Sequence, residues 1–331
     1  MFGYIVRRVV AAILVVIVTS MFVFALFFLG PSDPASIICN QNSRCTAEKQ
    51  ANLEDALGLD ESVITEYGVF VKGIFAGRTI SLGAGANYEC SAPCLGVSFV
   101  TRQEVTELLK DKYPATLSLA IVGGSLYLLI GGTLGIFAAK WRGSAADRIL
   151  VGTSLVVSSI PYYLLALLSW LFLVNQYNLF PSTGYFPITD NPAKWAGGML
   201  LPWLVIGVSN SPQYARFGRG SMVETLSEDY IRTASAKGLP RNKVLFKHAL
   251  RAAIVPIVTI FGLDLAFLLA GTLVTEKIFE IDGIGAWGLE AIPVDLPVIS
   301  ATVLVGAVLV VVANLVVDIL YSFLDPRVRL A

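Results

Sequence analysis

Six long stretches of the chain carry almost no charge, and polar segments separate them. They cover residues 9–29, 115–139, 149–174, 198–215, 252–274 and 298–321. Because hydrocarbon about 30 Å thick is crossed by roughly 20 apolar residues in a helix, this pattern predicts an all-α membrane protein with six transmembrane helices. The fourth stretch is the weakest, since it is short and interrupted by polar residues and Pro212.

The basic residues predict the orientation of these helices, because Lys and Arg are retained on the cytoplasmic side more strictly than acids are. With the N-terminus inside, segments 1–8, 140–148, 216–251 and 322–331 hold 15 of the 24 basic residues, in half the length of the outside segments. Both termini are therefore expected in the cytoplasm. The first stretch is interpreted as an uncleaved anchor, because it is longer than the apolar part of a secretory signal and no small-residue cleavage site follows it.

The composition excludes other classes of protein. Hydrophobic residues make up 55% of the 331 residues and charged residues 15%, whereas soluble domains carry about 25% charged residues. The mean hydropathy is +0.71. A disordered chain is excluded and a soluble globule is not expected. Since 24 basic residues balance 24 acidic ones, no basic excess is available to bind nucleic acid.

The long outside loop, residues 30–114, contains all four cysteines: Cys39, Cys45, Cys90 and Cys94. An even count in an oxidising compartment predicts two disulfides. Three connectivities are open, and the local pairs Cys39–Cys45 and Cys90–Cys94 are favoured because each closes a short loop. A zinc site is the alternative, but the loop holds no His. Helical apolar spacing over residues 53–75 indicates a small packed globular cap.

The longest cytoplasmic loop, residues 216–251, contains a predicted helix of about ten residues. Ser227 is the expected N-cap, Glu228 and Asp229 occupy the first turn, and Lys237 lies in the last turn. Gly238 can adopt the left-handed conformation after the helix, and Pro240 prevents its continuation.

Small residues fill the centre of this predicted helix: Thr233, Ala234, Ser235 and Ala236. Basic residues flank it, among them Arg232, Arg241 and Lys243. A short helix that can be approached closely suits docking into a groove of a cytoplasmic partner. The alternative is a basic helix that rests on anionic lipid headgroups.

The stretch DYIRTASAKGLPRNKVLFKHALRAAIVP resembles the cytoplasmic coupling motif of permease subunits of ATP-binding-cassette (ABC) importers, in the branch that takes up dipeptides and oligopeptides. The residues that match the motif are Thr233, Ala234, Ala236, Lys237, Gly238, His248, Ala249, Leu250, Arg251 and Pro256. GPSDPA, ALGLD, PATLSLA, FPSTGY, EKIFEIDGIGAWGLEAI and NLVVDILYSFLDPRVR extend the resemblance over nearly the whole chain. The cysteine-containing segments of the outer loop have no counterpart in the usual pattern.

The resemblance implies one of two homologous permeases with a type I importer fold: a first helix (1–29), the outer loop (30–114) and a permease core (115–331). It implies two cytoplasmic ATPase subunits that carry ATP and Mg, and an external solute-binding protein. The ATPase-coupling residues would be Glu228, Asp229, Arg232, Thr233, Ala234, Ala236, Lys237, Gly238 and His248. The chain itself has no phosphate-binding G-x-x-x-x-G-K-[ST] loop, so it is expected to be no enzyme and to bind no cofactor or metal.

The cargo is less well defined, since the same family pattern serves peptides, glutathione, nickel complexes and some sugars. Asp264 lies near the middle of the fifth stretch, where a charge is costly, so it is either a substrate contact or a structural hydrogen-bond partner. Asn210 and Gln213 are further candidates for the substrate pathway.

Small residues four apart, Gly131 with Gly135 and Gly262 with Ala266, permit close helix contacts that either slide or are static. Gly283, Gly285 and Gly288 match G-x-G-x-x-G, but a turn near the outer mouth explains them better than dinucleotide binding. A secondary transporter or a membrane enzyme is less well supported, because the sequence shows no repeat of the spans and no nucleophile or metal cluster within them.

Overall fold

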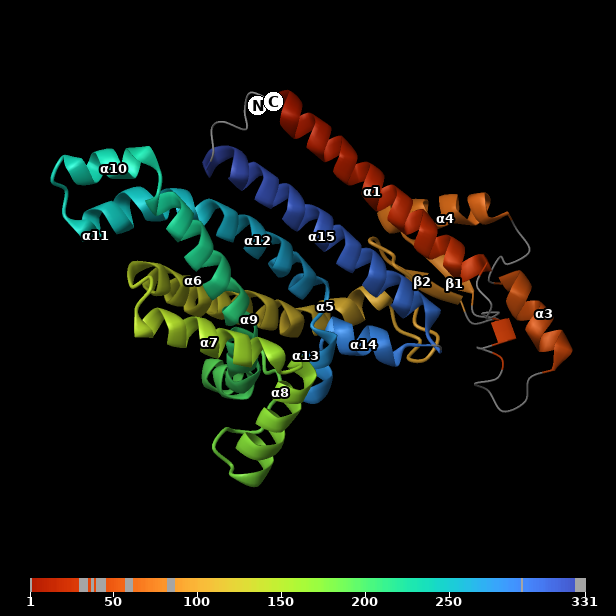
Figure 1. Cartoon of the computed structure of the whole chain (residues 1–331). Coiled ribbons are helices and arrows are strands. Elements are labelled where there is room, and N and C mark those ends of the chain that lie inside the picture. The colour runs from red at the N-terminus through yellow and green to blue at the C-terminus, as the bar shows by residue number, and fades with distance from the viewer. Residues whose placement is uncertain are drawn as a thin grey trace.

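The structure is a computed structural model, and it describes residues 2–29, 35–36, 39, 46–56, 62–81, 87–292 and 294–324. It is mostly helical (Figure 1). Within this part of the chain, four helices are long and apolar enough to cross a membrane: Val6–Ala25, Val105–Lys140, Arg241–Ala270 and Leu296–Val317. A fifth span results if Ala145–Ser159 and Tyr162–Gln176, which meet at 88°, are taken together.

The helices of the N-terminal half and the outer region are α1 (Phe2–Leu29), α3 (Ala47–Ala56), α4 (Val63–Ala76), α5 (Val105–Ser118), α6 (Gly124–Lys140), α7 (Ala145–Ser159) and α8 (Tyr162–Ser169). The remaining helices are α9 (Pro192–Leu226), α10 (Asp229–Ala236), α11 (Arg241–Lys243), α12 (Leu250–Ala270), α13 (Leu273–Ile278), α14 (Ile284–Glu290) and α15 (Leu296–Leu324). The π-helical segments Leu119–Gly123 and Val244–Ala249 join neighbouring helices, and a third, Trp170–Gln176, continues α8. The described strands are β1 (Arg78–Ser81) and β2 (Asn87–Cys90).

The centre of the molecule is the contact between α6 and α9. Gly131 and Gly135 lie on the face of α6 that meets α9, and a Cβ added to Gly131 would lie 2.4 Å from the backbone oxygen of Ser211. At Gly135 the corresponding distance to the oxygen of Ala215 is 2.7 Å. The two glycines therefore allow the helix backbones to touch, which is how small residues contribute to packing in membranes.

Two helices lie outside this centre. α15 packs against α12, where a Cβ on Gly262 would overlap Val317, and α1 packs against α15. Only 6% of the apolar window of α1 is buried, and side chains such as Val10, Leu14 and Phe22 are more than half exposed. α1 thus presents most of its surface to the surroundings of the bundle (Figure 1).

The third predicted stretch is not one straight helix. Ile160 adopts an extended conformation (φ −83°, ψ 122°) and the next helix begins after Pro161. A proline disfavours the helical conformation of the residue before it, and this explains the break.

The segments that flank the predicted cytoplasmic loop are longer helices than expected. The fourth stretch lies inside α9, which continues through residues 216–226 to Leu226. On the other side, the chain is helical from Arg241 to Ala270. Most of the predicted loop 216–251 therefore consists of the ends of two long helices, with α10 between them.

The outer region contains two helices where one apolar pattern was found. The interval 53–75 falls on the end of α3 and on α4, which begins after Ser62, whose Oγ accepts a hydrogen bond from the Thr65 N–H. Strands β1 and β2 follow as an antiparallel pair with Arg78 opposite Cys90.

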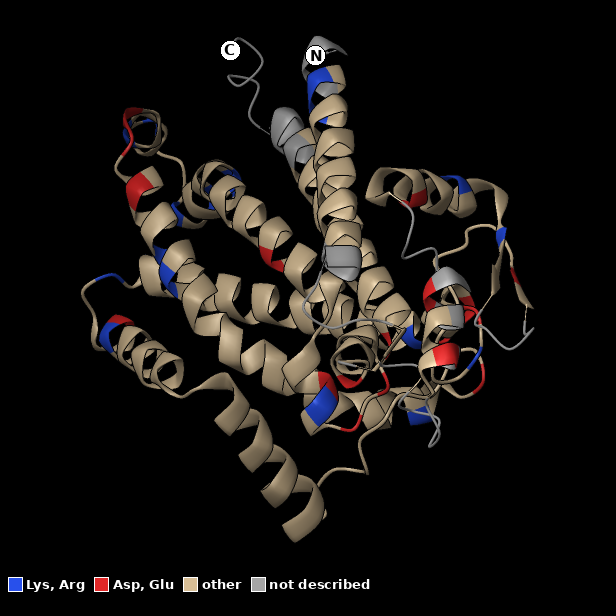
Figure 2. Cartoon of the chain, turned by 90° about the vertical axis from the view of Figure 1, so that its right-hand side faces the viewer, with Lys and Arg blue, Asp and Glu red and all other residues tan. Residues whose placement is uncertain are grey.

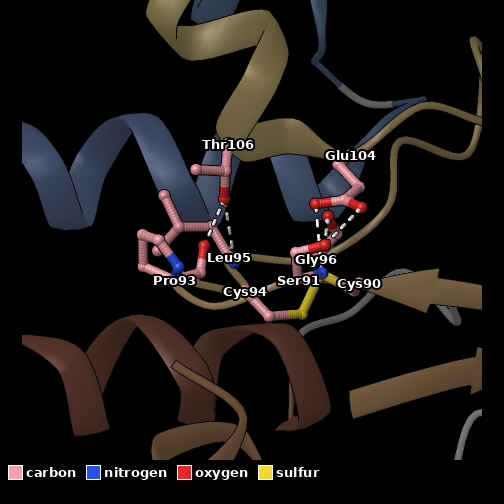
Figure 3. Close-up of a disulfide and its surroundings, with 8 residues drawn as sticks. All are labelled: Cys90, Ser91, Pro93, Cys94, Leu95, Gly96, Glu104 and Thr106. Carbon is pink, nitrogen blue, oxygen red and sulfur yellow. Dashed lines mark hydrogen bonds between the residues drawn. A yellow bond between two sulfur atoms is a disulfide. The ribbon is translucent and has the colours of Figure 1, made fainter. Parts of the chain in front are cut away.

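A disulfide joins Cys90 to Cys94, with the Cα atoms 5.4 Å apart (Figure 3). Beside it, Thr106 donates a hydrogen bond to the Pro93 carbonyl and Glu104 accepts from the Ser91 N–H, so the loop is attached to the start of α5. Cys39 is also disulfide-bonded and is buried in the same small core. Its expected partner, Cys45, lies outside the described residues.

Candidate functional site

The predicted docking helix is α10, which spans Asp229–Ala236. Its inner face is held by Ile231 and Ala234, which are 3% and 9% exposed. They pack in a cluster with Met222 of α9 and with Val244 and Leu245 of the following helix. Gly238 follows the helix with φ +77°, the left-handed conformation that favours glycine.

The start of α10 differs from the expectation. Ser227 does not cap it: Ser227 ends α9 and donates its hydroxyl to the Glu224 carbonyl. The N-cap is Glu228, without a side-chain capping hydrogen bond. Because α9 continues to Leu226, only residues 227 and 228 remain to connect the two helices, and Ser227 is used for the end of the first.

The small residues of α10 are divided between two faces. Ala234 points into the protein, while Thr233 and Ala236 are exposed, as are Arg232 and Lys237. Asp229 lies in the first turn and pairs with Arg232 at 3.6 Å on the exposed surface. His248 lies in the π-helical segment Val244–Ala249 and is half-buried. The exposed face of α10 is therefore mainly polar and carries charges of both signs.

A partly buried ion pair that the sequence analysis missed fixes α9 to α7. The Arg219 guanidinium donates two hydrogen bonds to the Asp147 carboxylate, Nε to Oδ1 at 2.6 Å and Nη2 to Oδ2 at 2.7 Å. The Gly143 N–H also donates to Asp147. A bidentate pair of this kind fixes orientation as well as distance. Ser144, with Asp147 three residues later, is a sequence signal for the start of α7. No sequence signal indicates that Arg219, 72 residues away, is the partner of Asp147.

The charged residues are concentrated near the ends of the helices. Lys, Arg, Asp and Glu lie mainly at the two ends of the bundle and in the outer region, and the helices between them are nearly free of charge (Figure 2). This is the pattern of a bundle with an apolar middle band, which fits burial in a bilayer.

Asp264 is a charged residue within this band. It is half-buried and accepts a hydrogen bond from the Tyr214 hydroxyl at 2.7 Å. Tyr214 is 1% exposed and packs against Tyr127 with the ring centroids 4.8 Å apart. The carboxylate thus has a structural partner, which favours the second of the two interpretations given for it.

Asn210 and Gln213 lie on the exposed side of α9. The Asn210 amide donates to the Ile206 carbonyl of its own helix. Further along the same face a groove of about 500 Å³ opens between α9 and α12, with walls that include Phe217, Glu224 and Ile257. The structure does not bring Asn210 and Gln213 into contact with Asp264 through any hydrogen bond of the described residues.

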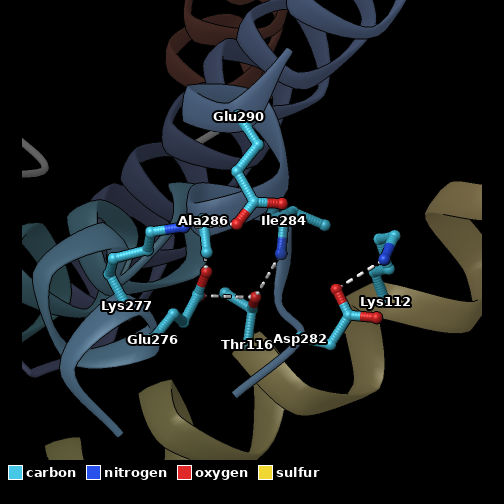
Figure 4. Close-up of polar contacts among 8 residues, drawn as sticks. All are labelled: Lys112, Thr116, Glu276, Lys277, Asp282, Ile284, Ala286 and Glu290. Atoms are coloured by element: carbon cyan, nitrogen blue, oxygen red, sulfur yellow. Dashed lines mark hydrogen bonds and ion pairs between the residues drawn. The ribbon is translucent and has the colours of Figure 1, made fainter. Parts of the chain in front are cut away.

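A further buried polar group is the carboxylate of Glu276, which is completely buried (Figure 4). Its Oε1 accepts from the Thr116 hydroxyl at 2.8 Å and from the N–H and hydroxyl of Thr272, and its Oε2 accepts from the Ala286 N–H at 2.8 Å. The Thr116 oxygen also accepts from the Ile284 N–H at 3.0 Å. Glu276 therefore joins α5, α13 and α14 into one unit.

This carboxylate accounts for two of the three glycines of the motif, whereas a Cβ on Gly288 would meet Thr302. A Cβ on Gly283 would lie 2.3 Å from the Glu276 carboxyl carbon, and one on Gly285 would lie 3.0 Å from its Oε2. Phe279 and Ile281, in the turn between α13 and α14, are 0% and 2% exposed and belong to the main core. The expected turn is thus an inserted hairpin whose glycines make room for Glu276.

The outer region is tied to the bundle by Asp295. Its carboxylate accepts from the Ser98 hydroxyl and from the Phe99 N–H, the latter at 3.1 Å. Burial raises the pKa of Asp295, and the hydrogen bonds from Ser98 and Phe99 oppose that rise. The disulfide loop is therefore held at a defined place beside the first turn of α15.

Two family models match the chain. Residues 131–330 match the binding-protein-dependent transport system inner membrane component, and residues 1–120 match the N-terminal model for the membrane component of such systems.

Similar proteins cover the chain from end to end. It is 33% identical over 327 residues to a probable peptide ABC transporter permease, y4tP, of Sinorhizobium fredii, which covers 98% of this chain and 99% of that protein. It is 33% identical over 353 residues to the dipeptide transport system permease protein DppB of Escherichia coli K12, with 99% of each covered.

One solved structure supports the fold. A chain of the MetNI methionine ABC transporter in an inward-facing conformation aligns with a TM-score of 0.54 and 18% identity, over 66% of this chain and 97% of that chain. The chain therefore belongs to the inner-membrane permease components of binding-protein-dependent ABC importers, in which separate subunits hydrolyse ATP, and it is not itself an enzyme.

Proposed function

We propose that this chain is one of two homologous permease subunits of a bacterial importer for dipeptides and oligopeptides, and that it forms half of the translocation pathway in the cytoplasmic membrane. The observation that carries the proposal is the 33% identity, over the full chain, to permeases of peptide and dipeptide transport systems. ATP and Mg are assigned to two cytoplasmic ATPase subunits, and delivery of the peptide to an external solute-binding protein.

The proposed topology has six spans. It adds α9 to the four long apolar helices and counts the bent pair as one span. α9 does not need an apolar surface throughout, because side chains in its middle such as Met199, Trp203 and Ile206 are 5% exposed or less. The N-terminal end of α1 and the C-terminal end of α15 lie at the same end of the bundle as α10 (Figure 1). With the excess of basic residues there, this supports a cytoplasmic location for that end and an external one for the disulfide loop.

In this arrangement α10 is the coupling helix. Its exposed residues Glu228, Asp229, Arg232, Thr233, Ala236 and Lys237 form the contact with an ATPase subunit, while Ala234 and His248 support the helix from the protein side. Gly238 allows the chain to turn back into the fifth span. Movement of α10 is then passed to α9 and to the helix that begins at Arg241, which produces alternating access.

The proposed pathway follows the exposed face of α9. Asn210, Gln213, Phe217 and Glu224 are separated by three, four and seven positions, so they lie on one side of the helix. The groove of about 500 Å³ on this side is large enough to admit a small peptide.

Transport by the assembled complex in proteoliposomes tests the cargo. With the cognate binding protein outside the vesicles and ATP inside them, we expect uptake of a labelled dipeptide that competes with unlabelled dipeptides. Glutathione, nickel and free amino acids are assayed in parallel as alternative cargoes. Uptake of nickel or glutathione without uptake of peptide would overturn the peptide assignment and leave the importer class unaffected, and uptake without ATP would contradict the importer class itself.

A further inference from the structure

Helix α4 of the outer region is attached to the side of α1. The Tyr67 hydroxyl lies 2.7 Å from the Ser20 hydroxyl, and the Phe24 ring packs against the rings of Tyr67 and Phe70 at centroid distances of 5.6 and 5.4 Å. One face of α4 is therefore occupied by the outer half of α1.

Another face of α4 is apolar and bare. Ile64 and Phe75 are 81% and 80% exposed, the highest values among the large hydrophobic side chains described. They are eleven positions apart, which is about three turns of helix, so they lie on nearly the same side. Gly68 lies between them and is exposed, and Lys72 borders the stripe. Two large apolar side chains that are this exposed on one side of a helix are candidates for burial against a partner or against lipid.

The position of α4 along α1 indicates what covers this patch. The apolar window of α1 is Val6–Ala25, and the contact residues Ser20 and Phe24 lie in its last two turns. α4 runs across α1 at this level, with the hairpin β1–β2 and α3 on one side of it (Figures 1 and 2). α4 therefore crosses α1 near the outer end of the apolar window of α1.

The contact with α4 lies beside side chains that α1 presents to its surroundings. Ile17 and Met21 of α1, next to the contact, are 51% and 56% exposed. A helix that crosses a span where the hydrocarbon ends is placed to bury apolar side chains among acyl chains and to extend a lysine toward the phosphates.

We infer that α4 is an interfacial helix that lies on the outer leaflet, with Ile64 and Phe75 inserted among the lipid chains and Lys72 at the headgroups. The inference requires α1 to cross the membrane with its C-terminal end outside, and it does not require a peptide cargo. β1 begins directly after α4, and the Arg78 guanidinium lies over the Phe70 ring at 5.4 Å. The lipid contact therefore sets the height of the disulfide-containing region above the membrane.

Spin labels report directly how deep positions 64 and 75 of α4 lie in the membrane. Ile64→Cys, Phe75→Cys and Glu89→Cys are each labelled in the full transporter, without reductant because Cys39, Cys90 and Cys94 are disulfide-bonded. Glu89 is exposed on β2 and serves as the matched control outside the membrane. In nanodiscs of phosphatidylcholine and phosphatidylglycerol, we expect labels at 64 and 75 to collide several-fold more with oxygen than with a water-soluble nickel chelate. The label at 89 should show the opposite ratio.

A protein partner is the other occupant of such a patch. If labels at 64 and 75 are open to the nickel chelate in nanodiscs and become shielded on addition of the binding protein, the surface belongs to that protein and the inference is wrong. Equal exposure of all three labels to the chelate, with or without the binding protein, also overturns it. Failure of transport with any cargo leaves this test unaffected, because the readout is depth.

Discussion

The carboxylate of Glu276 accepts four hydrogen bonds in a part of the molecule otherwise filled by apolar side chains. All four donors would be buried and unpaired without it, and a buried donor that loses its acceptor costs about 1–3 kcal/mol. The arrangement makes one residue responsible for the position of the whole α13–α14 hairpin. Its role is to hold the hairpin in place.

We expect Glu276→Gln to lower the stability of the complex by about 1–3 kcal/mol, because the new amide NH₂ group faces a donor that needs an acceptor. Thermal unfolding of the purified complex measures the effect. Glu290→Gln is the matched control: its pair with Lys277 is more than half exposed on both sides, and such pairs contribute about 0–1 kcal/mol. Equal losses for the two variants would show that the buried network does not hold the hairpin.

The clearance at Gly283 gives a second prediction at this scale. Gly283→Ala is expected to destabilise the protein, because the new Cβ would lie 2.3 Å from the Glu276 carboxyl carbon. In a Glu276→Ala background the same change should cost little, so the two effects are non-additive. Gly132→Ala, at a position with nothing within 4 Å of an added Cβ, is the control. Melting curves of the two single variants and the double variant complete the cycle, and additive losses would contradict the steric explanation.

At the scale of the elements, α10 owes its position to two side chains and its proposed partner contact to the others. Ile231 and Ala234 hold it to α9 and to the helix that follows. A change at Ala234 therefore disturbs the permease itself, and a test of docking has to use the exposed face.

Ala236→Trp places a large side chain on that exposed face and is expected to abolish co-purification with the ATPase subunits and ATP-driven uptake. The amount of permease in the membrane should not change, because Ala236 is exposed. Ala146→Trp is the matched control, an exposed alanine at the start of α7. Pull-down from membranes and vesicle uptake are measured together. Normal assembly of the Ala236 variant would remove α10 from the interface.

Comparison of the sequence with the structure at this scale shows which elements local signals determine. Long apolar stretches located the four long apolar helices, and Gly238 marked the end of α10, because these features act within a few residues. The break at Ile160 was overlooked although Pro161 was visible, since the uncharged run continued across it. Ser227 was assigned to the wrong helix because α9 continued further than its apolar part.

Contacts between distant segments were not predictable from local patterns. Glu276 meets Thr116 across 160 positions and Asp147 meets Arg219 across 72. No periodicity encodes such pairs. The resemblance to permeases extended over the segment around Glu276, and the glycine spacing indicated a turn, but the reason for Gly283 and Gly285 is a carboxylate supplied from α13.

For the whole molecule, the proposed orientation makes a prediction about accessibility. Arg232→Cys on α10 and Glu89→Cys on β2 replace exposed residues at opposite ends of the bundle. In intact cells a membrane-impermeant maleimide is expected to label position 89, and to label position 232 only after the cytoplasmic membrane is opened. The reverse pattern would invert the topology and would exclude α10 as an ATPase contact.

The connection between α9 and α10 consists of residues 227 and 228. α9 has 35 residues and is about 50 Å long at 1.5 Å per residue, and the helix on the other side of α10 has 30. Exposed turns usually tolerate added residues. Here a single inserted glycine would make the connection to α10 flexible. α10 could then move with an ATPase subunit without changing the tilt of either long helix. If α10 contacts an ATPase as proposed, the number of residues in this turn therefore matters more for coupling than the identity of its exposed side chains.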